Sequence, residues 1–400
     1  SFGNYLHDNG SVMVFVPTFY FRVGDSSADQ YDEFGANTLE IRGRKYYSNE
    51  SEANADGFIL HRAFIDNGVE KDGFFIDKYT ASQSSSDSNI AVSVRYGVPI
   101  SLDTDTNYTN SNGMTGCVGE LHDAVTLSRA RGTGYQCASL FQYSALAMIS
   151  LAHAQVSQTQ NVCAWRDGSF IKAFPKGCND DNLGDVDDPE VSYISAGDAG
   201  DSSKPQTGSG EPFAKTTHNG QECGIADVNG GMWEVSLGIT QPGSSSTASA
   251  GGQGNTFYIL DETVELASLT NGHNGSTDAW GDATHLSTLY SSFTSPIDMN
   301  FGGSWTYWGN GTEPVFFSSQ SGTDRALNGI LVPAETSHSA DGINILGSDG
   351  IYRLTRENLF VLSCGNWNNT SNAGPFTRIF GYWRSVSSRS SSFRSCRYGS

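Results

Sequence analysis

The residues with the strongest chemical character lie in the last fifty positions of this 400-residue chain. Residues 351–400 hold seven arginines, no lysine and a single acid, on a chain whose formal net charge is −20. Tyr382 and Trp383 stand there among serines and arginines such as Arg378 and Arg389. Rigid aromatic rings, forked guanidinium donors and small hydroxyls dominate antibody-type paratopes and interface hot spots. This composition favours non-covalent recognition over catalysis.

The same segment also allows structural interpretations. Phe376, Phe380, Phe393 and Trp367 are expected to be core, and the serine run at 385–395 could be a disordered tail. Disorder is not expected, because Trp, Phe and Arg residues interrupt the run. Repeated Arg-Ser pairs could contact RNA bases. The strongly acidic remainder of the chain would repel phosphate, however, so no nucleic-acid partner is expected.

Seven cysteines and eight histidines could in principle support catalysis or bind a metal. No cysteines form a C-x-x-C pair and no histidines lie three or four residues apart, so a metal site is not expected. Because seven is odd, at least one thiol is unpaired within the chain, and both disulfides and buried free thiols stay open. Residues 179–190 (NDDNLGDVDDPE) are acidic enough for Ca²⁺ but lack EF-hand spacing. A solvated acidic loop is expected there.

Hydrophobic patterning indicates the elements that must position these residues. Residues 12–23 (VMVFVPTFYFRV) predict two short strands around a bend at the central proline, and residues 73–79 predict another strand. Apolar residues at helical spacing predict the longest helix at about 139–154, with Ser139 as its N-cap. A shorter helix is predicted near 121–130.

The second half of the chain is richer in loops. Residues 197–210 and 243–255 are rich in Gly and Ser and are expected to be exposed loops. Strands are predicted at 256–260 and 329–332, and residues 283–293 have a helix-like pattern. No apolar run is long enough to predict a membrane-spanning helix. The opening SFGNYLHDNG has neither the basic nor the apolar region of a signal peptide.

Several short stretches resemble one family in the correct order. Residues 14–22 (VFVPTFYFR), 74–80 (FFIDKYT) and 129–145 (RARGTGYQCASLFQYSA) resemble the opening strands and helix region of the formylglycine-generating branch of the C-type lectin fold. Residues 224–235 (GIADVNGGMWEV) are similar to that branch's D-x-N-G-N-x-W-E signature, in which the glycines permit a tight turn and the Trp suits a core position. Residues 364–394 are similar to its closing element.

The resemblance implies one mixed α+β domain of the C-type lectin type over residues 1–400, with short antiparallel strands, two helices and much irregular loop. Residues 240–350 would form a large insertion, and residues 363–397 a variable region. No Glu-Pro-Asn or Gln-Pro-Asp tripeptide of sugar-binding lectins occurs, and neither a metal nor a cofactor is expected. The fixed scaffold would include Trp233, Trp367, Phe376, Arg384 and Phe393.

Two functional branches share this fold. The enzymatic branch uses a reactive cysteine pair or a His-rich metal site. Here Cys364 and Cys396 are far apart in sequence and the histidines are scattered, which disfavours a formylglycine-generating or related oxidase activity. The other branch comprises the variable proteins of diversity-generating retroelements, in which adenine-directed mutagenesis rewrites the final segment. Residues 365–374 (GNWNNTSNAG) and 375–394 (PFTRIFGYWRSVSSRSSSFR) are similar to that segment.

The second resemblance implies a non-enzymatic receptor-recognition protein on a phage tail or a prokaryotic cell surface. Its ligand would be a protein or glycan on another cell or host surface, and no membrane insertion is expected. Nothing in the sequence sets the oligomeric state. A structural virion or surface protein without a variable site is a further alternative. The residues expected to bind the ligand are Asn366, Asn368, Thr377, Ile379, Gly381, Tyr382, Trp383, Val386, Ser388, Arg389 and Ser390.

Overall fold

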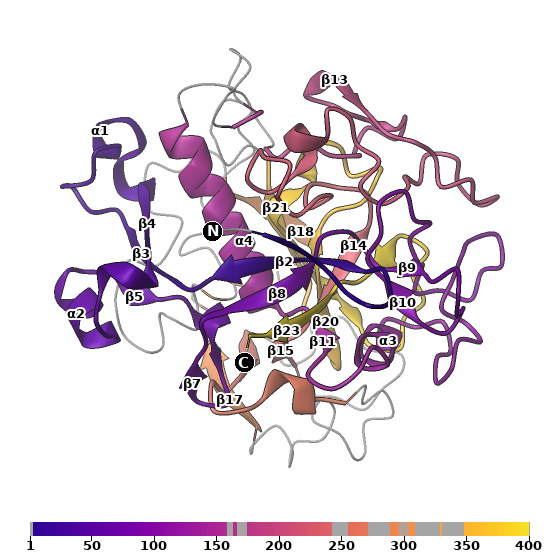
Figure 1. The fold of residues 1–400 in the computed structure, drawn as a ribbon, viewed down its shortest axis with the longest axis horizontal. Coiled ribbons are helices and arrows are strands. Elements are labelled where there is room, and N and C mark those ends of the chain that lie inside the picture. Colours follow the sequence, from indigo (N-terminus) through magenta and orange to yellow (C-terminus); the bar gives the residue numbers. More distant parts are fainter. Residues whose placement is uncertain are drawn as a thin grey trace.

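The longest helix of the described chain, α4 (Leu140–Val156), runs through the middle of the molecule (Figure 1). It begins with a capping box, in which the Ser139 hydroxyl accepts from the Gln142 amide and the Gln142 side chain accepts from the Ser139 amide at 2.6 Å. Most of its residues are buried on every side, which is typical of a core helix. The predicted helix at 139–154 is therefore confirmed, as is the shorter one near 121–130, which is α3 (Asp123–Arg129).

The computed structural model describes residues 3–157, 163–165, 174–241, 255–270, 289–295, 298, 303–308, 329 and 348–399. Helices and strands are interspersed along this part of the chain, and the strands form several small sheets, so the fold class is α+β as predicted. Within these ranges no helix combines the length and the apolar character needed to cross a bilayer. The shorter elements are α1 (Tyr31–Phe34), α2 (Glu50–Ala55), β6 (Ile65–Asp66), β7 (Val69–Glu70), β9 (Ser82–Gln83) and β10 (Ala91–Val92).

A five-stranded sheet brings the two ends of the chain together (Figure 1). The C-terminal strand β23 lies inside this sheet, where Cys396 pairs with Ile76 on one side and with Gln136 on the other. The strands predicted at 12–23 and 73–79 are confirmed as β2, β3 and β8, with the bend after Pro17. The spatial order is β1 (Asn4–Leu6), β2 (Val12–Pro17), β8 (Gly73–Asp77), β23 (Ser395–Tyr398) and β11 (Gln136–Cys137).

A separate three-stranded sheet lies beside α4. Its central strand is β3 (Phe19–Val23), which pairs with β4 (Leu39–Gly43) and β5 (Ile59–Leu60). These strands and α1 and α2 lie to the left of α4 in Figure 1.

A six-stranded sheet contains the strands of the closing segment that precede β23. Its strand β20 is buried on both faces, which agrees with its unbroken apolar start, LFVL. Two pairs, β19 with β21 and β14 with β22, are parallel, and the others are antiparallel. The order is β18 (Ser304–Tyr307), β19 (Gly350–Arg353), β21 (Gly374–Trp383), β20 (Leu359–Cys364), β14 (Trp233–Ser236) and β22 (Ser391–Ser392).

The described parts of residues 240–350 contribute to two sheets. Strand β18 adds to the edge of the six-stranded sheet, and β16 (Thr256–Leu260) pairs with β15 (Ile239–Thr240) and β17 (Tyr290–Thr294). The strand predicted at 256–260 is confirmed. The helix-like pattern at 283–293 is wrong over its last residues, because five-residue pairing with β16 makes them a strand. Most of the strand predicted at 329–332 and most of the loop at 243–255 lie outside the described residues.

The acidic stretch at 179–190 is not the solvated loop that its composition predicts. It forms the hairpin of β12 (Gly184–Asp185) and β13 (Asp188–Ser192), in which Asp185 and Asp188 are buried. The buried ammonium of Lys215 lies 2.9 Å from both Asp188 and Glu190, which compensates their charges. The loop at 197–210 is likewise only partly exposed.

Candidate functional site

Buried aromatic and arginine side chains hold the closing segment in place. The five residues predicted as scaffold are at most 3% exposed, in agreement with a structural role. Fixed positions of this kind make the neighbouring backbone rigid. They are Trp233, Trp367, Phe376, Arg384 and Phe393.

The signature turn at residues 229–231 positions two parts of this segment. Gly230 and Gly231 have φ of 108° and 80°, which side-chain-bearing residues rarely adopt. The carbonyl of Gly231 accepts a hydrogen bond from the Trp367 amide at 3.1 Å, and the amide of Trp233 donates to the Ser390 carbonyl at 2.9 Å. The turn therefore brings the loop at 365–374 next to the turn that follows β21.

A polar pocket of about 280 Å³ lies between these two loops. Six of the eleven residues predicted to bind ligand line it, and Trp233 and Trp367 form part of its wall. Asn369 also lines the pocket and was not predicted, although it directly follows Asn368 in the same loop. The six predicted residues are Asn366, Asn368, Ile379, Tyr382, Arg389 and Ser390.

The other five predicted residues do not line this pocket. The prediction that Thr377 binds the ligand is wrong, because this residue is fully buried. Its hydroxyl donates to the Asn372 carbonyl at 2.5 Å, so Thr377 has a packing role. Val386 and Ser388 tie the turn to the body of the protein through backbone hydrogen bonds. Gly381 and Trp383 lie further along β21, where the Arg356 guanidinium packs on the Trp383 ring at 5.1 Å.

Arg378 and Arg389, whose guanidinium groups the composition of the tail suggests as recognition donors, have different environments. Arg389 is exposed at the pocket, and within the described chain it pairs with no carboxylate. Arg378 is fully buried and donates to the carbonyls of Pro375 and Thr377 at 2.8 and 2.7 Å, and burial lowers its pKa to about 10. The expectation for Arg378 is therefore wrong. Of the seven arginines of the tail, four are buried, namely Arg353, Arg378, Arg384 and Arg394.

No protein-family model matches this chain, and no curated protein is significantly similar to it.

A buried ion pair joins β14, the strand that follows the signature turn, to the closing segment. The Arg394 Nε donates to the two carboxylate oxygens of Glu234 at 3.0 and 2.8 Å, and both side chains are fully buried. Further Arg394 donors reach the carbonyls of Lys78 at 2.8 Å and Ala226 at 2.6 Å, and the Tyr143 hydroxyl donates to Glu234. Glu234 of the signature and Arg394 of the closing element, 160 residues apart in sequence, are thus in direct contact.

The cysteines of the closing segment and two of the histidines are in surroundings that suppress their reactivity. All seven cysteines are free thiols, and burial raises the pKa of Cys364 and Cys396. Burial also lowers the pKa of His61 and His218 to about 3. Among the residues that the structure describes, no group of three or more His, Cys, Asp or Glu is placed to hold a metal ion.

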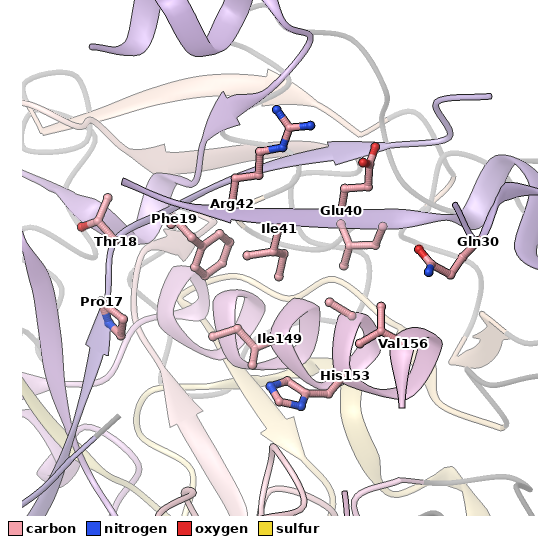
Figure 2. Close-up of a pocket in the computed structure, with 13 residues that line it drawn as sticks. Pro17, Thr18, Phe19, Gln30, Glu40, Ile41, Arg42, Ile149, His153 and Val156 are labelled. Atoms are coloured by element: carbon pink, nitrogen blue, oxygen red, sulfur yellow. The ribbon is translucent and has the colours of Figure 1, made fainter. Parts of the chain in front are cut away.

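A larger pocket, of about 420 Å³, lies between β4 and the C-terminal half of α4 (Figure 2). Ile41 points from β4 toward the helix, whereas Glu40 and Arg42 point away from it. Glu40 pairs with Arg22, and Arg42 with Asp56, on that other face. The pocket interior is therefore mainly apolar, and none of the predicted site residues lines it.

Proposed function

We propose that this protein is a non-enzymatic recognition protein whose closing segment presents a diversifiable ligand-binding surface. The observation that carries this proposal is the pocket at the signature turn. Residues from both halves of the closing segment, 366–369 and 379–390, meet there above buried Trp233 and Trp367. Variable polar and aromatic side chains on a rigid base are the arrangement that antibody-type paratopes use.

The glycines of the segment support a division into fixed and variable positions. A Cβ on Gly374 would collide with the Asp349 carboxylate at 1.8 Å, and one on Gly365 would lie 2.7 Å from Ala373 at a φ of 95°. A Cβ on Gly381 would meet only ordinary contacts, the nearest being the Tyr352 ring at 3.4 Å. Gly381 can therefore accept side chains, whereas the other two glycines cannot.

We further propose that the fold is of the C-type lectin type and that a diversity-generating retroelement varies the segment. The contact between Glu234 and Arg394 supports this proposal, because the two motifs that carry the resemblance stabilise each other. Such a protein would act at a virion tail or cell surface. A near-copy of the tail-coding DNA, with adenines at the differing codons and beside a reverse-transcriptase gene, is the genomic observation that tests this origin.

The enzymatic alternative has less support. A thiol nucleophile needs an ionised, accessible sulfur, whereas Cys364 and Cys396 are fully buried with raised pKa values. A purely structural protein would not need a polar pocket at the only segment that resembles a variable region.

A display experiment tests the proposed function directly. One library randomises the six predicted residues that line the pocket, and a control library randomises six exposed apolar residues elsewhere. Both are selected against the same panel of unrelated purified proteins and glycans. The pocket library should stay folded and yield binders to several targets, well above the control. Equal yields, or general unfolding of the pocket library, would refute the proposal. The control positions are Tyr46, Val69, Tyr96, Val118, Val186 and Ile194.

A supplementary test uses the chain as it stands. Replacing Tyr382, Trp383 and Arg389 together by Ala should abolish binding to a ligand found for this chain, while the melting temperature changes little. A collapse of folding would show that these side chains belong to the core.

A further inference from the structure

A row of aromatic rings lies beside the pocket on the six-stranded sheet. Along β18 and the residue that follows it, Thr306 and Trp308 are buried, whereas Trp305 and Tyr307 are half-buried on the opposite face. The Trp305 and Tyr307 rings are almost parallel, 6.3 Å apart at 16°. Tyr352 of β19 lies edge-on to Trp305 at 5.5 Å. These three rings form a partly open apolar platform.

The platform is continuous with the pocket. Trp305 pairs with Tyr352, and Tyr352 pairs with Ile379, so the three side chains share one face of the sheet. Two strand spacings separate the first from the last, or about 10 Å. Ile379, which is buried, forms part of the pocket wall, and Tyr382 lines the same pocket. A chain-like ligand could contact both areas.

The side chains of the pocket are suited to form hydrogen bonds with the hydroxyl groups of a ligand. Its three asparagine amides offer donors and acceptors together, and Ser390 adds a hydroxyl. The Oδ1 of Asn366 is buried and has no hydrogen-bond partner within the described chain. Among the described residues no acidic side chain lines the pocket, although the chain has a net charge of −20, and Arg389 supplies an exposed cation.

We propose that the pocket and the aromatic platform are adjoining subsites for a carbohydrate chain, whose acidic sugar occupies the pocket. This inference rests on the proposed recognition function. Asparagine amides and Ser390 satisfy the sugar hydroxyls, Arg389 pairs with a carboxylate or sulfate, and the aromatic faces cover the apolar C–H faces of the following sugars. A pocket of about 280 Å³ fits one sugar unit better than a folded protein surface.

The amino acids of the pocket would then vary between versions of the protein, whereas those of the platform would not. The platform residues Trp305, Tyr307 and Tyr352 lie outside the segment 363–397, so they stay constant while the pocket residues change. Constant aromatic faces would keep a carbohydrate class bound, and the variable residues would select the sugar.

Binding of the full chain to immobilised oligosaccharides tests the inference. The panel holds sialylated, uronic-acid-containing and sulfated glycans, each beside its desialylated, carboxyl-reduced or desulfated counterpart. We expect at least about tenfold tighter binding to one acidic member than to its neutral counterpart, a difference worth about 1.4 kcal/mol. Arg389→Gln should remove that preference.

Variants of the platform separate the two subsites. Trp305→Ala should weaken binding of the oligosaccharide several-fold but leave binding of the isolated acidic sugar unchanged, and Trp305→Phe should restore most of the loss. Tyr46→Ala, at an aromatic residue that is 63% exposed and outside the site, is the matched control and should have no effect. Equal weakening by the control would overturn the assignment of the platform.

The remaining outcomes are also decisive. If no glycan binds, or binding ignores both the acidic group and Arg389→Gln, the carbohydrate assignment is wrong. The proposed function stands in that case provided that the pocket library yields protein binders. If that library yields no binders at all, the proposed function itself fails.

Discussion

The ion pair between Glu234 and Arg394 should carry a large share of the stability of the closing segment. Replacing Glu234 by Gln removes the negative charge and leaves a fully buried guanidinium without its partner, which costs about 3–5 kcal/mol in comparable pairs. Arg394→Met should cost at least as much, because carbonyls of Lys78 and Ala226 also lose a donor. The free energy of unfolding is measured by urea titration, with tryptophan fluorescence and circular dichroism as probes.

A double variant and a surface control complete the test. Glu234→Gln combined with Arg394→Met should cost less than the two single losses together, by about 2 kcal/mol or more, because the second change removes the stranded charge. Asp56→Asn, at a partly exposed pair with Arg42 at 3.3 Å, should cost less than about 1 kcal/mol. A Glu234→Gln loss no larger than that of Asp56→Asn would refute the reasoning.

Three further predictions concern the cap, a buried acid and the two arginines. Ser139→Ala should lower the free energy of unfolding by about 1 kcal/mol through loss of the capping box, and Asn49→Ala, the cap of the short and mostly exposed α2, should lower it less. Burial raises the pKa of Asp227 from 3.8 to about 6, so the wild type loses stability as the pH rises across that interval and the carboxyl ionises. Relative to the wild type, Asp227→Asn should therefore gain up to about 3 kcal/mol between pH 4 and 7 in urea titrations, and a constant difference would contradict this. Arg378→Ala should destabilise the protein by more than about 2 kcal/mol, whereas Arg389→Ala should change its stability by less than about 0.5 kcal/mol; similar thermal shifts for both would contradict the assigned burial.

The features that were predictable from the sequence are those with a local physical cause. Helix α4 has both its cap and its apolar spacing within one continuous stretch, and β2, β3 and β8 are short apolar runs. The scaffold residues Trp233 and Trp367 were identifiable because large rings beside glycine turns seldom stay in solvent.

The features that were not predictable depend on distant partners. Arg378 and Arg389 lie eleven residues apart and have sequence neighbours of similar type. Only Arg378 lies on β21, which is covered on both faces over most of its length, so its side chain is buried. An irregularity in the pairing of β20 with β21 also breaks the alternation by which side chains could be assigned to faces. In the acidic hairpin the charges of Asp188 and Glu190 are compensated by Lys215, which lies outside the hairpin and further along the chain.

The place of β23 inside its sheet has a consequence for which mutations in the closing segment the fold can tolerate. The closing segment ends in strands β22 and β23, and β23 separates β8 from β11 while Arg394 reaches Glu234. A stop codon or frameshift anywhere in the segment removes the strand that completes the sheet and leaves a buried carboxylate unpaired. Substitutions in frame keep both. The sheet and the ion pair thus make folding depend on an intact closing segment.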